Sequence, residues 1–261
     1  MKTLVLVLSV LVMLPTFGQS LLPVAFTTAA DNYQNGSVLL EISCGESITE
    51  TMQSSSAFLT TGFLQGTLNT SNRLVFKVFP EGLYAGNNNL QKALSQSGYQ
   101  FPGPISDVIG LKIHSGTNYA RILYAQDSIS LDTMGIASLL VPGFIVEPSY
   151  LCLHHRNCIP TVSSIPMSFN RSPLFYDFTT SSSKAFGNKL KEMDGVFVLY
   201  SGDVNEDGLI DLLDMLQITT HSNLFSMGYM VEDLNGDGGI DALDMILCDN
   251  NAALKIQAVT P

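Results

Sequence analysis

The chain has 261 residues, of which 46% are hydrophobic and 13% are charged, so it can bury a substantial core. Its 23 acidic and 12 basic residues give a formal net charge of −11. Because the sequence has no basic patch, nucleic acid is excluded as an expected partner.

The first 19 residues have the features of a secretory signal peptide. Lys2 precedes an apolar run from Leu4 to Leu14, and Gly18 is a small residue suited to a cleavage site. A run of eleven residues is too short to span a bilayer, which needs about 20. We therefore expect cleavage after Gly18 or Gln19, a secreted or cell-surface mature chain, and no transmembrane segment in it.

Residues 20–200 have the pattern of β structure. Residues 20–70 are rich in Thr, Ser and Gly and contain alternating segments at 37–43 and 57–63, which predict a small N-terminal β unit. In residues 71–200, Pro and Gly separate runs rich in β-branched and aromatic residues, at 73–79, 108–114, 119–125, 136–141 and 150–154. This spacing predicts a mainly β fold with an immunoglobulin-like β-sandwich. Residues 252–261 are expected to return as a C-terminal strand or tail on the sandwich edge.

The cysteines leave two interpretations open. They are Cys44, Cys152, Cys158 and Cys248. An exported protein permits disulfides, and Cys152 and Cys158 could close a small loop. Four cysteines are few for a disulfide scaffold, however, so buried free thiols are an equal alternative. The adjacent His154 and His155 lie on a predicted strand and should point to opposite faces, which argues against a shared metal ion.

No familiar catalytic motif is present in the sequence. It lacks a Gly-x-Ser-x-Gly elbow, a His-Glu-x-x-His motif and a phosphate-binding Gly loop. The acids that could supply a pair for glycoside hydrolysis are Asp107, Asp127, Asp132 and Glu147. Nothing in their spacing brings two of them together. We therefore expect no enzymatic activity.

Two stretches near the C-terminus repeat one twelve-residue pattern, at 203–214 and 233–244. Oxygen-bearing side chains fall at positions 1, 3, 5, 9 and 12, with Gly at position 6 and Ile at position 8. Ca²⁺ takes six to eight oxygen ligands, and a short loop can surround it only with a sharp turn. Gly208 and Gly238 allow that turn because Gly adopts positive φ without steric cost.

We expect each loop to bind one Ca²⁺ ion, with the main-chain carbonyl of position 7 completing the ligand set. The expected ligands of the first loop are Asp203, Asn205, Asp207, Leu209, Asp211 and Asp214. Those of the second loop are Asp233, Asn235, Asp237, Gly239, Asp241 and Asp244. Ile210 and Ile240 are expected to pair across the two loops.

The acidity of the chain is local to these loops. Eleven acids and no Lys or Arg lie between Asp203 and Asp249, whereas acids and bases balance in the rest of the chain. Crowded carboxylates repel one another until a cation neutralises them. The charge pattern therefore favours bound cations.

The two loops resemble the duplicated calcium loops of type I dockerins. In that family each loop is followed by one helix, and Asp214 and Asp244 stand at position 12, where the ordinary EF-hand has Glu. The apolar segment 195–202 predicts a strand that runs into the first loop, and apolar residues at helical spacing follow each loop. The resemblance covers residues 201–251. It implies a small α-helical module with two F-hands and two Ca²⁺ ions, and a cohesin-like or cell-surface protein as partner.

The sequence departs from the dockerin pattern at positions 10 and 11. Dockerins that bind cohesins tend to have small hydroxyl residues there, whereas this chain has Leu212-Leu213 and Ala242-Leu243. The apolar face either docks a partner or packs on the β domain. Residues 150–157, 176–187 and 249–253 also resemble secreted Bacteroidetes-type proteins of unknown function.

We therefore expect a secreted calcium-binding protein whose dockerin-like module mediates attachment or protein–protein interaction. The alternative is an accessory component of extracellular polysaccharide degradation, either carbohydrate-binding or associated with a glycoside hydrolase.

Overall fold

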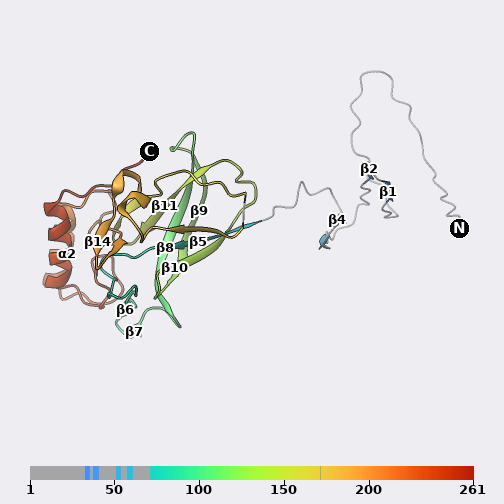
Figure 1. Cartoon of the computed structure of the whole chain (residues 1–261). Helices are drawn as coiled ribbons and strands as arrows, with labels where there is room; N and C mark the ends of the chain where they lie inside the picture. The colour runs from blue at the N-terminus through green and yellow to red at the C-terminus, as the bar shows by residue number, and fades with distance from the viewer. Residues whose placement is uncertain (1–32, 36–37, 41–50, 54–57, 61–70, 171) are drawn as a thin grey trace, which may run out of the picture. The chain divides into compact units, whose positions relative to one another are not determined.

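The computed structural model describes residues 33–35, 38–40, 51–53, 58–60, 71–170 and 172–261 (Figure 1). Contacts divide the chain into two compact units, Met1–Leu68 and Asn69–Pro261. Residues 71–200 and 201–251, predicted as successive domains, lie within the second unit. The predicted signal peptide and Cys44 fall outside the described residues. Within those residues, no helix is long and apolar enough to cross a membrane.

In the first unit, four short strands pair as two hairpins. β1 (Tyr33–Asn35) pairs antiparallel with β2 (Val38–Leu40), and β3 (Thr51–Gln53) pairs antiparallel with β4 (Phe58–Thr60). β2 and β4 fall inside the alternating segments 37–43 and 57–63, so these two predicted strands are confirmed.

The second unit contains a seven-stranded sheet in the order β12-β11-β8-β9-β10-β5-β13. Its strands are β5 (Asn72–Lys77), β8 (Ile105–Ser115), β9 (Ile122–Asp132), β10 (Ile136–Val141), β11 (Ser149–His155), β12 (Cys158–Val162) and β13 (Leu174–Asp177). Neighbouring strands run antiparallel, except that β13 runs parallel to β5. Two small ribbons and two 3₁₀ turns complete residues 71–200, called the β domain below. They are β6 (Leu94–Ser95) with β7 (Gly98–Tyr99), β14 (Lys191–Met193) with β15 (Val196–Val198), η1 (Ser182–Lys184) and η2 (Phe186–Asn188).

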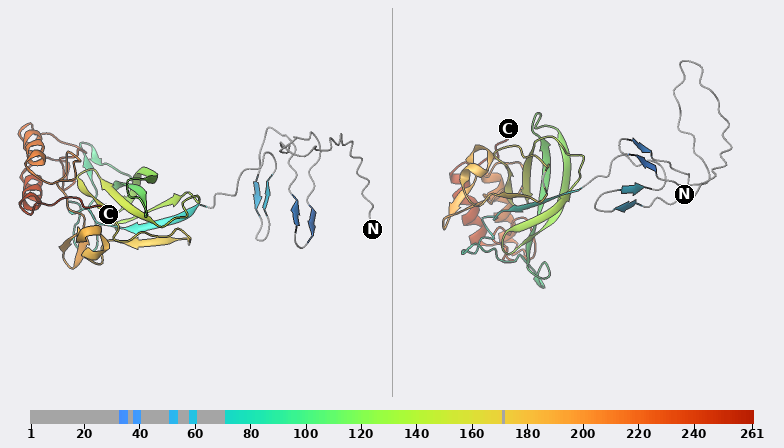
Figure 2. Two further views of the ribbon diagram at one scale, coloured as in Figure 1. Left: turned by 90° about the horizontal axis from the view of Figure 1, so that it is seen from above. Right: turned by 45° about the vertical axis from the view of Figure 1, so that its right-hand side comes forward.

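One face of the sheet covers a core, because its strands alternate buried and more exposed side chains. Leu74 and Phe76 of β5 are fully buried, and Ala137, Leu139 and Val141 of β10 are buried at alternate positions. The pairing of β8 with β9 shifts register at three places, and such bulges bend a strand pair. One large cluster of buried side chains packs in this unit. The predicted mainly β, sandwich-like fold is confirmed, and Figure 2 shows the arrangement of its strands.

Two helices, α1 (Leu212–Asn223) and α2 (Ala242–Ala253), lie side by side at one end of the second unit (Figure 2). Each helix begins directly after one of the acidic loops, as predicted. Asp211 and Asp241 cap them: each side chain accepts a hydrogen bond from the backbone two residues on, and Asp214 and Asp244 complete a capping box.

The loops and helices share a second buried cluster. It contains Ile159, Val204, Ile210, Ile218, Leu234, Ile240, Cys248 and Ile256. Ile210 and Ile240 are therefore buried in one core, but their backbone N–H groups donate to Ile256 and Ser226 instead of to each other.

The C-terminal segment returns to the first loop, and the expectation that it joins the sandwich edge is wrong. The Ile210 N–H donates to the Ile256 carbonyl (2.9 Å), and the Ala258 N–H donates to the Gly208 carbonyl (2.7 Å). On this path Ile256 is buried in the loop–helix cluster, which removes its apolar side chain from water.

α2 is also tied to the β domain by a buried polar network. The Asn251 side-chain amide donates to Glu81 (2.6 Å) and to the Ser201 carbonyl (2.7 Å). The Lys191 ammonium pairs with Glu81 and donates to the Asn251 Oδ1 atom. The module therefore joins the β domain through side chains as well as through the chain itself.

Three cysteines lie in the described residues, and all are buried free thiols: Cys152, Cys158 and Cys248. The alternative of a Cys152–Cys158 disulfide is wrong. The Cys152 sulfur lies 3.3 Å from His154 Nε2, whereas the Cys158 sulfur lies 3.4 Å from His155 Nδ1. The two histidines thus face different surroundings, as their adjacent positions in a strand predicted.

Candidate metal centre and interaction face

The carboxylate at position 12 closes each loop in the same way. Asp214 accepts hydrogen bonds from the Val204 N–H (2.9 Å) and the Asp211 N–H (2.9 Å). In the second loop, Asp244 accepts from the N–H groups of Leu234 (2.7 Å) and Asp241 (2.9 Å). This side chain therefore ties the start of each loop to the start of the following helix.

The turn at the middle of each loop is held by the carboxylate at position 1. Asp203 accepts a hydrogen bond from the Gly208 N–H, and Asp233 accepts one from the Gly238 N–H, both at 3.1 Å. The two glycines have φ values of 81° and 80°, where a side chain is strained. The predicted need for Gly at position 6 is thus explained by the backbone.

The Asn at position 3 and the Asp at position 5 complete the correspondence between the loops. Asn205 accepts from the Asp207 N–H, and Asn235 accepts from the Asp237 N–H, both at 2.8 Å. The twelve residues predicted as ligands therefore occupy two loops with matching internal hydrogen bonds. Asp211 and Asp241 act as helix caps through Oδ1, and whether they also bind a metal stays a prediction.

Acidic groups are buried and crowded in both loops. Burial and the nearby charge of Asp214 raise the pKa of Asp203 to about 7. Burial raises the pKa of Asp233 to about 6, although the Arg156 guanidinium opposes this rise. Burial also raises the pKa of Asp214 and the pKa of Asp244. Such shifts favour a bound cation, because a cation offsets the cost of keeping these groups ionised.

One oxygen in the first loop fits a metal ion directly. Asp203 Oδ1 is buried and lacks a hydrogen-bond partner among the described residues. An unpaired buried carboxylate oxygen is costly unless an ion contacts it. In the described part of the chain, no group of three His, Cys, Asp and Glu side chains is placed to hold a metal ion by itself. A calcium site here would therefore also need the Asn amide and main-chain carbonyl oxygens that Ca²⁺ accepts.

The two helices expose an apolar face to solvent. The exposed fractions are 77% for Leu212, 57% for Leu213, 60% for Leu216, 55% for Leu243 and 54% for Ile246. The alternative in which this face packs on the β domain is therefore wrong. Ile218 and Cys248, on the other side of α1 and α2, supply the packing instead. An exposed apolar patch of this kind is typical of an interaction surface.

One comparison with known proteins agrees with the loop geometry. Residues 201–251 match the family model of the dockerin type I domain. Below, this segment is called the dockerin module. One solved structure that matches is a type II cohesin–X-dockerin complex from Acetivibrio cellulolyticus, with 15% sequence identity over 69% of this chain and 94% of the matched chain, and a TM-score of 0.40. No curated protein matches the chain. The resemblance of other segments to Bacteroidetes-type proteins stays a prediction.

Sequence reasoning missed a buried cluster at the border between the β domain and the dockerin module. His155 Nε2 lies 3.3 Å from Asp107 Oδ2, and Arg156 Nε donates to the same oxygen at 3.2 Å. The Cys158 sulfur lies beside His155 on the other side of the ring. Cys158, His155 and Asp107 are therefore arranged in the same sequence of contacts as a catalytic Cys–His–Asp triad. The His155 and Asp107 side chains are fully buried, so a substrate has no access and the cluster is structural. Only a fold that joins β8 to β11 brings these residues together.

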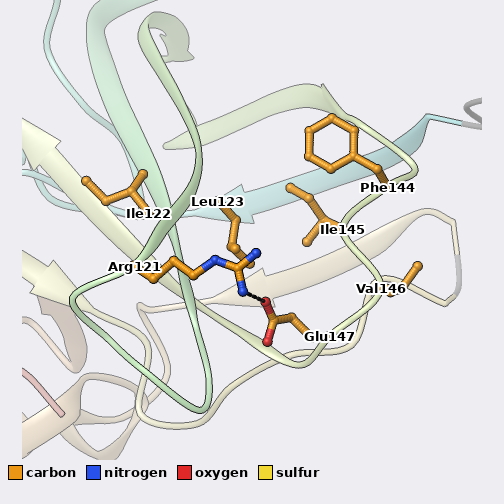
Figure 3. A pocket seen from close by; sticks show the side chains of 7 residues that line it. All are labelled: Arg121, Ile122, Leu123, Phe144, Ile145, Val146 and Glu147. Carbon is orange, nitrogen blue, oxygen red and sulfur yellow. Dashed lines mark hydrogen bonds and ion pairs between the residues drawn. The ribbon is translucent and has the colours of Figure 1, made fainter.

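Among the described residues, no contact joins any two of the four acids that could have formed a pair for hydrolysis. Asp107 belongs to the buried cluster, and Asp132 accepts hydrogen bonds from the N–H groups of Met134 and Ile136 in a turn. Glu147 pairs with Arg121 at 3.4 Å beside a pocket of about 310 Å³ (Figure 3). The pocket is lined by Arg121, Ile122, Leu123, Phe144, Ile145, Val146 and Glu147. Three of the four acids thus have structural partners.

Proposed function

We propose that this chain is a secreted, non-enzymatic protein that binds two Ca²⁺ ions and attaches to a cohesin-like partner through the α1–α2 face. The exposed apolar face beside loops that match a type I dockerin carries this proposal. Bound Ca²⁺ would neutralise the crowded carboxylates and fix the helices that present the face. The alternative role in polysaccharide degradation is not favoured by any contact among the described residues.

Calcium binding is tested by isothermal titration calorimetry of the whole secreted chain. We expect two ions per chain, with Asp203, Asn205, Asp207 and Asp214 as side-chain ligands in one loop and their counterparts in the other. Asp203→Ala and Asp233→Ala should each remove one ion, because each deletes the position 1 carboxylate of one loop. A stoichiometry of zero for the unaltered chain would refute the calcium proposal.

Partner binding is tested with immobilised cohesins in the presence of Ca²⁺. Leu213→Asp and Leu243→Asp should each abolish capture, because a charge desolvated in an apolar contact is costly. Val146→Asp is the matched control, since Val146 is 81% exposed but lies on the β domain near the pocket of Figure 3. Equal losses for all three substitutions would mean that the helix face is not the contact.

The absence of catalysis is tested by a broad screen with glycan, ester and peptide substrates. We expect no turnover above background. Reproducible activity that is lost in Asp127→Asn or Glu147→Gln would overturn this part of the proposal and favour the polysaccharide-degradation alternative.

A further inference from the structure

The two calcium loops differ in their surroundings although their internal geometry matches. Position 4 is Glu206 in the first loop and Gly236 in the second. Glu206 is exposed, whereas Gly236 is buried. A Cβ atom on Gly236 would lie 2.4 Å from Leu83 of the β domain, which leaves no space for a side chain. The second loop therefore rests on the β domain at a position where the first loop faces solvent.

Hydrogen bonds from the β domain reach the main chain of the second loop. The Leu94 N–H donates to the Gly236 carbonyl (2.9 Å), and the Gln91 amide donates to the Asn235 carbonyl. The Asn157 amide donates to the Asp233 carbonyl (3.1 Å). For the first loop, the described contacts of this kind come from the C-terminal segment instead, at Ile210 and Gly208.

Arg156 of the β domain also contacts the second loop. Its Nη1 atom donates to the Asp233 carbonyl (2.6 Å) and to the Met230 carbonyl. Its Nε atom donates to Asp107, and its guanidinium lies 4.7 Å from the centre of the Tyr229 ring. Tyr229 itself donates to Asp107. One side chain thus links strand β8 to the entry of the second loop.

The charge of Arg156 would by itself oppose a calcium ion in the neighbouring loop. Asp107 lies 3.2 Å from the Arg156 Nε atom and offsets part of that charge, since the same carboxylate also pairs with His155. The favourable contribution of Arg156 to calcium binding is that it orders the loop backbone before an ion arrives. A binding site that is already ordered loses less entropy on binding.

We propose that the β domain, through Arg156, holds the second loop in its folded shape, so that this loop binds Ca²⁺ more tightly than the first. Arg156 is a positioning residue, since it contacts the main chain of the loop. The inference rests on the calcium binding proposed above and adds an order of filling: the second loop fills first, and its ion also stabilises the contact with the β domain.

The test uses calorimetry on full-length chains with one loop disabled. With Asp203→Ala, only the second loop binds, and adding Arg156→Lys should weaken its affinity about tenfold, the scale seen for outer-shell residues. Lys keeps a positive charge, but its single nitrogen cannot replace both the Nε atom that reaches Asp107 and the Nη1 atom that reaches the two carbonyls. With Asp233→Ala, only the first loop binds, and Arg156→Lys should leave its affinity unchanged. Arg121→Lys, remote from both loops, is the control.

A reciprocal pair of substitutions checks the inference without altering Arg156. Gly236→Glu gives the second loop the residue of the first and should push it off Leu83, weakening the second site. Glu206→Gly makes the opposite exchange in a solvent-exposed place and should leave the first site nearly unchanged. Hydrogen exchange at the Leu94 amide should quicken on calcium removal and in Gly236→Glu.

The outcomes separate the two proposals. No binding heat in the unaltered chain would refute calcium binding itself. Two bound ions with equal affinities in the single-loop chains, and no selective effect of Arg156→Lys or Gly236→Glu, would refute only the inference that the β domain positions the second loop.

Discussion

His155 shows how a single buried residue can make stability depend on pH. Burial lowers the pKa of His155, but its neighbours Cys158 and Asp107 raise it to about 9. Burial alone raises the pKa of Asp107, yet His155, Arg156 and Tyr229 lower it well below its usual range. The folded state therefore favours the ion pair formed by His155 and Asp107, although both side chains are removed from water.

We predict that stability falls between pH 6.5 and about 9 in excess Ca²⁺. A histidine whose folded pKa is raised contributes stability that is complete below its unfolded pKa, near 6.5, and is lost as the pH rises through the folded value. The loss amounts to at most about 3 kcal/mol. Denaturant titrations at several pH values measure it.

The control for that prediction is the neighbouring histidine. Burial lowers the pKa of His154 to about 4, so His154 is neutral above pH 7 in both states. His155→Gln should abolish the alkaline slope, whereas His154→Gln should preserve it. A slope that survives in His155→Gln would assign the pH dependence to another group.

At the scale of elements, α1 separates its packing residues from its exposed ones. Ile218 is fully buried, whereas Leu216, two residues earlier, is 60% exposed. Helical spacing places them on different faces. The apolar residues of this helix therefore serve two purposes, and hydrophobicity alone does not distinguish them.

We predict that Ile218→Ala destabilises the dockerin module by about 2–5 kcal/mol, because it leaves a cavity in a buried cluster. Leu216→Ala should change stability by no more than about 0.5 kcal/mol, as for most surface positions. Thermal unfolding followed at a helical wavelength compares the two. Similar losses for both would show that the exposed face is buried in solution.

Sequence reasoning succeeded where a structure depends on neighbouring residues. The loops and the helices that follow them are local patterns, and the strands predicted at 73–79, 108–114 and 136–141 overlap β5, β8 and β10. β12 was missed because it contains Pro160, which weakens a strand prediction; the structure places β12 at the sheet edge, where Pro is tolerated.

The parts that sequence reasoning missed depend on residues far apart in the chain. β13 pairs in parallel with β5, although the two strands are about a hundred residues apart in the sequence. No local sequence pattern predicts such a pairing. The contact of Arg156 with the Asp233 carbonyl is equally remote. The difference between Glu206 and Gly236 was visible in the sequence, but only the β domain gives it a reason.

At the scale of the whole molecule, two separate cores lie within one compact unit. The β domain buries its own large cluster, whereas the dockerin module depends on a small cluster around Ile218 and Ile240. A segment of about 50 residues buries too little apolar surface to offset its chain entropy comfortably. Metal binding should therefore supply much of the folding free energy of the module.

We predict that a calcium chelator unfolds the helices of the dockerin module, while the sheet of the β domain and the second-loop backbone that it holds stay folded. Circular dichroism should show loss of the helical signal with the β signature retained, and thermal unfolding should divide into two transitions. The same spectrum and the same transition with and without Ca²⁺ would show that packing on the β domain suffices to fold the loops.

The polar network of Asn251, Glu81, Lys191 and the Ser201 carbonyl has a consequence for geometry. α2 is fastened to the β domain by side chains, and the chain passes from β15 to the first loop within a few residues. A partner bound to the α1–α2 face would therefore hold the β domain at one fixed angle. The β domain would not rotate freely, as it would on a flexible linker. Every bound copy would then present its β domain at the same angle to its own partner.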